Sequence, residues 1–308
     1  MVQQLNSRIY LIDGYDLGIK ERTGTYVIAE DELTLVDTGA SPSVPYIKQG
    51  LSELGYTLDQ VKYIIVTHVH LDHAGGAGLL LQDCPNAKVV VHPKGARHLA
   101  DPGRLIAGAR MVYGEQFDLL FDPIVPVPED RIIEKTEGGQ LEIGPACTLN
   151  FWDTPGHAKH HFGIYDPVSN GMFAGDTVGI RYQQLIPDGI KLFLPSTSPN
   201  QFDPAAMQLA IDRFQAANFD AIYYGHYGMT SEPKEALRQA GEWLVEFLEE
   251  AEAACAKQQS PQELAVRMQE LVRTHLRSLG VPDDHEVYSV IKVDMEVSAM
   301  GLLDYLSK

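Results

Sequence analysis

The chain has 308 residues, with 24 basic and 42 acidic side chains and a formal net charge of −18. A surface this acidic repels phosphate backbones and anionic lipids, which argues against nucleic acid and membrane as partners. The hydrophobic content of 44% is ordinary for a soluble globular protein, and the length allows one large domain or one domain with an extension.

Cysteine use and the N-terminal residues favour a cytoplasmic protein. Cys84, Cys147 and Cys255 lie far apart and form no CxxC pair, so we expect no disulfide framework. The N-terminal residues lack a basic start followed by a long apolar stretch, which predicts no signal peptide. No segment approaches the roughly 18 consecutive apolar residues of a membrane span.

The first half of the chain alternates short apolar runs with helix-like stretches. The apolar runs are rich in Ile, Val, Tyr and Leu and are bounded by turn residues, which is typical of strands. Strands are expected at 8–12, 25–29, 33–36, 62–66 and 88–91, and helices at 43–54, 76–82 and 93–100. Residues 101–130 are punctuated by Gly and Pro and are long for a connection, which predicts a lid, a binding loop or padding of the fold.

The second half continues with strands and then becomes helical. Strands are expected at 146–152 and 221–224, a hairpin at 163–165 and 172–174 around Asn170-Gly171, and a helix at 203–217. Helices are expected at 231–256 and 261–279, followed by a strand at 286–293 and a closing helix over the last dozen residues. This composition predicts a catalytic domain at 1–230 and a helical C-terminal extension at 231–308.

One short segment carries most of the functional signal. The run Thr67-His68-Val69-His70-Leu71-Asp72-His73 places four ligand-type side chains within six residues, after an apolar strand and before a helix. In an extended segment, residues two apart point the same way, so His68 and His70 can face one ion. Asp72 and His73 follow the turn into the helix and can reach a second ion. Imidazole and carboxylate without a nearby thiol favour a catalytic over a structural metal site.

Three later segments place a ligand-type residue in a Gly-rich turn after an apolar strand. They contain His157 (WDTPGH), Asp176 (FAGDT) and His226 (YYGH). Strand ends at one edge of a sheet are where sites gather in layered α/β folds. We therefore expect these residues to join the histidine-rich run.

Together these motifs resemble those of the metallo-β-lactamase superfamily. The matching residues are HxHxDH at 68–73, TPGH ending at His157, GDT with Asp176, GH ending at His226, and the early acidic turn Val36-Asp37-Thr38-Gly39. The resemblance spans about residues 8–230. It implies an α/β fold, the four-layer αββα sandwich, with metals at one edge and here with a helical C-terminal extension.

The resemblance also implies a ligand set for two divalent metal ions. His68, His70 and His157 would hold the first ion, Asp72, His73 and His226 the second, and Asp176 would bridge them. Asp37 would orient a histidine ligand, as metal-bound histidines usually require. The ligand set favours zinc, and iron, manganese and cobalt are alternatives.

Asp176 discriminates among branches of this superfamily. Classical antibiotic-destroying members have Cys at this position, whereas Asp resembles the glyoxalase II and lactonase branches. We expect a hydrolase that uses a metal-bridging hydroxide, oriented by Asp72, to cleave an ester, thioester or lactone of a small molecule. Lactonases of the superfamily carry a tyrosine shortly after the bridging aspartate. Here Gly179 is three places on and Tyr182 lies further along, which is a departure from that branch.

Other functions and residues remain open at this stage. The alternatives are a mononuclear iron oxidoreductase similar to persulfide dioxygenases, a phosphodiesterase, and a non-catalytic metal-binding protein. The complete second ligand set favours the dinuclear hydrolase. Four residues are candidates for contact with substrate or a ligand, the alternative being surface positions: His160 and His161, in a HAxHH continuation, and Arg181 and Tyr182. The extension is expected to pack on the catalytic domain, to cap the substrate pocket or to form a homodimer surface.

Overall fold

The computed structural model describes residues 2–308, which form two compact units. The first unit contains residues 2–154, 160–175 and 219–231, and the second contains 155–159, 176–218 and 232–308. The domain division at residue 230 stays a prediction. The compact units group residues 155–159 and 176–218 with the C-terminal segment.

The first unit contains a seven-stranded sheet in the order β1 to β7. Its strands are β1 (Val2–Gln4), β2 (Ile9–Asp13), β3 (Gly24–Ile28), β4 (Leu33–Val36), β5 (Val61–Ile65), β6 (Lys88–Val91) and β7 (Ile132–Glu134). Pairing is antiparallel from β1 to β4 and parallel from β4 to β7. The carboxyl ends of β4 and β5 therefore meet at one edge, where the acidic turn and the histidine-rich run begin.

A second sheet of the same unit has six strands. Its order is β15 (Met229–Thr230), β14 (Ala221–Tyr224), β11 (Gly171–Gly175), β10 (Phe162–Asp166), β9 (Cys147–Asp153) and β8 (Gln140–Gly144). The predicted hairpin is confirmed, because β10 and β11 pair antiparallel with Asp166 opposite Gly171. Asn170 in its turn has a φ of 44°, a conformation that Asn tolerates better than most residues. β11 and β14 are parallel, so their following turns also share an edge.

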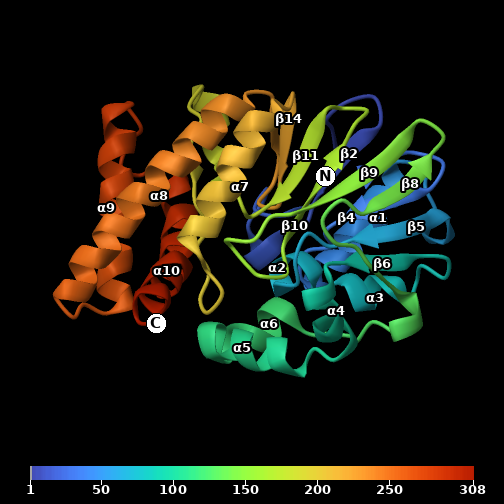
Figure 1. Ribbon diagram of the computed structural model, residues 1–308, viewed down its shortest axis with the longest axis horizontal. Helices are drawn as coiled ribbons and strands as arrows, with labels where there is room; N and C mark the ends of the chain where they lie inside the picture. The colour runs from blue at the N-terminus through green and yellow to red at the C-terminus, as the bar shows by residue number, and fades with distance from the viewer. Residues whose placement is uncertain (1) are drawn as a thin grey trace. The chain divides into compact units, whose positions relative to one another are not determined.

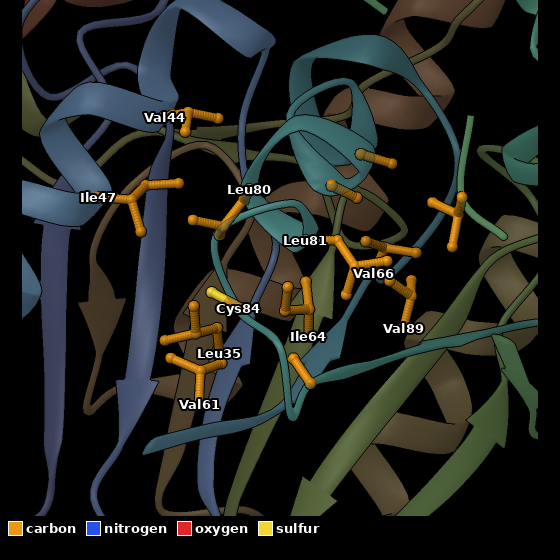
Figure 2. Close-up of a cluster of buried hydrophobic side chains, with 14 of the residues drawn as sticks. Leu35, Val44, Ile47, Val61, Ile64, Val66, Leu80, Leu81, Cys84 and Val89 are labelled. Carbon is orange, nitrogen blue, oxygen red and sulfur yellow. The ribbon is translucent and has the colours of Figure 1, made fainter. Parts of the chain in front are cut away.

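The central strands of the first sheet, β3 to β6, are largely buried on both faces. Figure 2 shows one face, where Leu35, Ile64 and Val89 pack against Val44 and Leu80 of the covering helices. These helices are α1 (Val44–Glu53), α3 (Ala77–Leu81) and α4 (Pro93–Ala100), beside β4 to β6 in Figure 1.

The next residue along each strand points to the opposite face. Val36, Ile65 and Val90 lie there, in a core shared with Phe151 and Phe173 of the second sheet. Side chains alternate between the faces because a strand has a period of two residues. Because both faces are buried, the sequences of these strands are continuous apolar runs. The resulting order of helices, sheet and sheet agrees with the predicted sandwich.

The insertion at 101–130 contains two helices. They are α5 (Gly103–Tyr113) and α6 (Phe117–Phe121). Phe117 and Phe121 are buried with Ala40 and Leu71, whereas Met111 of α5 and Leu119 of α6 are more than 80% exposed. The insertion is therefore anchored in the first unit through α6, and its role as a lid stays a prediction.

The second unit is mostly helical. Its elements are the hairpin β12 (Ile180–Arg181) and β13 (Phe193–Leu194), and the helices α7 (Pro204–Ala217), α8 (Pro233–Ala256), α9 (Pro261–Ser278) and α10 (Val287–Leu306). α8 contacts the other three helices and β13. None of the helices in residues 2–308 is long and apolar enough to cross a bilayer.

The predicted strand at 286–293 is wrong, because these residues belong to α10. Val287, Val290, Ile291 and Met295 are buried at intervals of three and four residues, which is the helical period. The run of β-branched residues favours a strand locally. Packing of α10 against α8 and α9 overrides that preference.

Candidate metal centre

The histidine-rich run leaves β5 and turns directly into a short helix, α2 (Leu71–Ala74). His70 is the residue before this helix, and its carbonyl accepts hydrogen bonds from the amides of His73 and Ala74. His68 is buried and His70 is half-buried. His68 Nε2 lies 3.0 Å from His70 Nδ1. Two ring nitrogens this close can share a proton or face one cation.

Asp72, His73 and His226 form a second convergent group within the first unit. Asp72 Oδ2 lies 3.6 Å from His73 Nε2 and 3.7 Å from His226 Nε2. One donor atom from each residue lies within 4.8 Å of the other two. His226 comes from the turn after β14. Two imidazoles and a carboxylate at this spacing fit a divalent ion of the zinc, iron or manganese type.

Asp37 joins both histidine groups through its two carboxylate oxygens. Its Oδ1 accepts a hydrogen bond from the Thr67 amide at 2.7 Å, and its Oδ2 accepts one from Thr67 Oγ1 at 3.0 Å. Oδ2 also lies 3.1 Å from His73 Nδ1, and Thr67 Oγ1 lies 3.1 Å from His68 Nδ1. A buried carboxylate thus holds His73 directly and His68 through a hydroxyl. These contacts are the ones expected of a group that orients histidine ligands.

His160, in the turn before β10, packs against the histidine-rich run. It is buried, and the amide of Val69 donates to its Nδ1 at 3.4 Å. Its ring is nearly parallel to that of His68, with centroids 6.3 Å apart, and perpendicular to that of His70 at 5.4 Å. The side chain therefore supports the segment between these two histidines and is not a surface residue.

The neighbouring His161, the other candidate of the HAxHH continuation, is buried, so the surface alternative is wrong for it. Its Nδ1 lies 2.8 Å from Thr154 Oγ1. A Cβ added to Gly175, which has a φ of 49°, would lie 2.4 Å from His161 Nε2. Only glycine therefore fits at Gly175, at the end of β11 and directly before Asp176.

The second unit holds His157 and Asp176 side by side. His157 Nε2 lies 3.6 Å from Asp176 Oδ2, and both side chains are buried. His157 Nδ1 donates to the backbone carbonyl of Ser196 at 2.9 Å, and Ser196 Oγ lies 3.4 Å from Asp176 Oδ2. The sequence did not indicate Ser196, because every residue supplies a backbone carbonyl.

Arg181 and Tyr182 make contacts within the second unit. The Arg181 guanidinium donates to the Gln183 side-chain carbonyl. Tyr182 is buried, and its hydroxyl donates to Asp294 Oδ2 of α10 at 2.9 Å. The surface alternative is therefore wrong for Tyr182. A contact of either residue with substrate stays a prediction.

Sequence reasoning missed the buried pair Asp16 and Arg22, which lies in the loop between β2 and β3. Arg22 Nε is 3.2 Å from Asp16 Oδ2. Burial raises the pKa of Asp16 to about 6 in spite of Arg22, and the charge of Asp72 also raises it. His226 and His73 lower this pKa. An acid and a base six residues apart in a polar loop carry no specific signal.

Comparison with known proteins identifies the family. The model of the metallo-beta-lactamase superfamily matches residues 22–226. The chain belongs to the metallo-beta-lactamase superfamily. It is therefore an enzyme of the metal-dependent hydrolase type, and its two sheets and C-terminal helices match this fold.

Relatives and solved structures agree with this membership. The chain is 28% identical over 178 residues to the metallo-beta-lactamase fold-containing protein ST1585 of Sulfurisphaera tokodaii, covering 56% of this chain and 61% of that protein. It is 25% identical over 244 residues to a hydroxyacylglutathione hydrolase of Idiomarina loihiensis, covering 77% and 76%. The crystal structure of ST1585 superposes with a TM-score of 0.68 at 22% identity, covering 96% of this chain and 98% of that one. The metallo-beta-lactamase family protein TTHA1429 of Thermus thermophilus gives 0.67 at 19% identity, covering 99% and 94%.

Proposed function

We propose that this superfamily member is a dinuclear hydrolase that cleaves an ester, thioester or lactone of a small molecule. The observation that carries the proposal is the Asp72 carboxylate, whose Oδ2 faces both His73 Nε2 and His226 Nε2. A mononuclear enzyme would not need this second group of donors. A relative named as a hydroxyacylglutathione hydrolase supports the reaction class.

The proposed ligands are those that the family motifs indicate. His68, His70 and His157 would hold one ion and Asp72, His73 and His226 the other, and Asp176 would contribute its carboxylate to both. Zinc is the favoured metal.

The cysteines support a centre without thiolate. Cys84 and Cys147 are buried in separate apolar clusters. Burial raises the pKa of the Cys84 thiol to about 11 and that of Cys147 to about 12. Both thiols therefore stay protonated at neutral pH, which leaves imidazole and carboxylate as the proposed donors.

The roles that we propose for Asp72 and for the histidines follow from their different exposure to solvent. Divalent ions bound at this centre supply Lewis-acid chemistry, by acidifying water and polarising a carbonyl oxygen. Asp72 has a side-chain exposure of 23%, whereas His73 and His226 are at most 5% exposed. Solvent therefore reaches the carboxylate, which suits it to orient water and accept a proton. The buried histidines keep their orientation through Asp37 and its neighbours.

The remaining expectations about the whole protein belong to this proposal. The substrate is a small molecule, because the net charge of −18 opposes binding of nucleic acid or an anionic membrane. We place the protein in the cytoplasm, with residues 231–308 capping the substrate pocket or forming a homodimer surface. The same charge disfavours the phosphodiesterase alternative for polymeric substrates.

The decisive experiment is a metal count combined with a substrate panel. Protein purified without added metal or chelator is analysed by plasma mass spectrometry, and turnover is assayed on lactones, thioesters and phosphodiesters. We expect two equivalents of a divalent metal and hydrolysis of a carbonyl ester. Asp72→Ala should lose metal and turnover, whereas the control Asp83→Ala, at an exposed position, should retain both. One equivalent of iron, with oxygen uptake on a persulfide and no hydrolysis, would favour the oxidoreductase.

A further inference from the structure

The loop between β2 and β3 is built to hold one buried acid, Asp16. The Asp13 carboxylate accepts hydrogen bonds from the amides of Tyr15 at 2.9 Å and Glu21 at 3.1 Å, which closes the loop around Asp16. Tyr15, Leu17 and Glu21 all have φ values between 49° and 57°. Three non-glycine residues in this region cost conformational energy, and such strain concentrates where a protein must present a particular group.

The negative charge of the buried Asp16 carboxylate is only partly balanced by neighbouring groups. It is only 3% exposed, and its Oδ2 faces Arg22 Nε at 3.2 Å. Its Oδ1 is buried and accepts no hydrogen bond from any residue in the range 2–308. A buried carboxylate with an oxygen lacking a partner is costly, so a single ion pair explains the position poorly. We therefore expect the Asp16 carboxylate to interact with a second positive group.

The strand that leaves this loop contacts the turn that carries His226. A Cβ on Gly24, at the end of the loop, would lie 3.1 Å from Cδ2 of Tyr227. Farther along β3, the Tyr26 hydroxyl lies 2.7 Å from the Tyr224 carbonyl and 2.6 Å from the Gly228 carbonyl. The loop and the turn are thus neighbours.

The charged groups around Asp16 also place it near the turn that carries His226. Asp72, His73 and His226 all lie within electrostatic range of its carboxylate. Asp16 and Asp72 repel each other, and a divalent cation beside Asp72 would relieve that repulsion.

We propose that Asp16 is a positioning carboxylate for the metal ion held by Asp72, His73 and His226. Its negative charge stabilises the cation and the histidines around it, and Arg22 keeps the carboxylate in its buried orientation. The proposal rests on the metal centre proposed above. Asp16 would act on the His226 side of the ion, as Asp37 does on the His73 side through Nδ1.

Two variants and a control test this role. Asp16→Asn keeps the size but removes the charge, Arg22→Gln removes the ion pair but keeps the carboxylate, and Asp31→Asn changes an exposed acid. The zinc dissociation constants of each protein are measured by competition with a chromophoric chelator. Thermal unfolding of the metal-free proteins reports any purely structural effect.

We expect Asp16→Asn to weaken binding of one of two zinc ions by about 10–100-fold, the range typical of groups that orient metal ligands. The other ion should bind as in the wild type, and Asp31→Asn should change neither. A loss below tenfold for both ions, with lowered thermal stability, would show that Asp16 only pairs with Arg22. If Asp16→Asn does not fold, Arg22→Gln decides. Because Arg22 keeps the carboxylate in its orientation, weaker binding of one ion only supports the proposal, and unchanged binding of both ions overturns it.

The wild-type protein separates this inference from the proposed function. Two bound ions with hydrolysis, together with an Asp16→Asn variant that binds both normally, would overturn only the role of Asp16. Fewer than two ions in the wild type would overturn the dinuclear centre and the role of Asp16 with it.

Discussion

The two units orient their candidate metal-binding histidines with different kinds of group. In the first unit, the side chain of Asp37 holds His73 directly and His68 through Thr67. In the second unit, the backbone carbonyl of Ser196 holds His157. A carboxylate adds charge and can be removed by substitution, whereas a carbonyl is neutral and present in every residue. A substitution of Asp37 therefore removes the group that orients the histidines of the first unit. A substitution of Ser196 leaves its carbonyl in place, so the orientation of His157 depends on the backbone conformation.

The largest effect should follow from removing the proposed ligands of the second unit. Asp176→Ala and His157→Ala each remove a donor, and we expect loss of metal and a fall in turnover of about a thousandfold, or about 4 kcal/mol. Metal content and hydrolysis of the substrate found by the panel are the measurements. Asp220→Ala, at an exposed position, is the control. Full metal content with a full rate in either ligand variant would contradict the assignment.

The next prediction compares the two orienting groups directly. Asp37→Ala should weaken metal binding about 10–100-fold, because His73 and Thr67 lose their acceptor. Ser196→Ala keeps the carbonyl that holds His157 and loses only a weak hydroxyl contact. Its effect should stay below about threefold, since such a contact contributes about 0.5 kcal/mol. Chelator competition measures both, and equal losses would show that the contrast between the units is wrong.

A smaller effect is expected at His160, which accepts a hydrogen bond from the Val69 amide. His160→Phe leaves this buried amide without an acceptor and should destabilise the metal-free protein by about 1–3 kcal/mol. His160→Gln offers a carbonyl oxygen and should recover part of that loss. Chemical denaturation measures the free energy of unfolding. Similar stability of the Phe and Gln variants would mean that this hydrogen bond contributes little.

The last prediction concerns the helical part of the second unit, where a substitution should change stability alone. Ser260 and Glu263 form a reciprocal cap at the start of α9. Ser260→Ala should lower stability by about 1 kcal/mol, measured by thermal unfolding, and leave metal content unchanged. A change in metal binding would instead indicate that α9 influences the metal-binding residues.

Most regular elements were predictable because their signals are local. The strands at 33–36 and 88–91 and the helix at 93–100 occur at the predicted residues. The prediction of a strand at 286–293 was wrong because the local signal did not decide the conformation there. Packing against neighbouring helices determines the conformation of this β-branched run. The helices at 103–113 and 117–121 were missed because Gly and Pro around them read as a loop.

The sequence by itself determined the types of candidate metal-binding side chain and their order, because HxHxDH and the three later turns place donors at strand ends whatever the details of packing. It also indicated Asp37 through its position in an acidic turn. Only the tertiary structure showed the contacts of Ser196, His160 and Asp16, because each depends on segments far apart in the chain. A carbonyl, a lone histidine and a loop acid carry no local signal, and their roles arise only when folding buries them beside a partner.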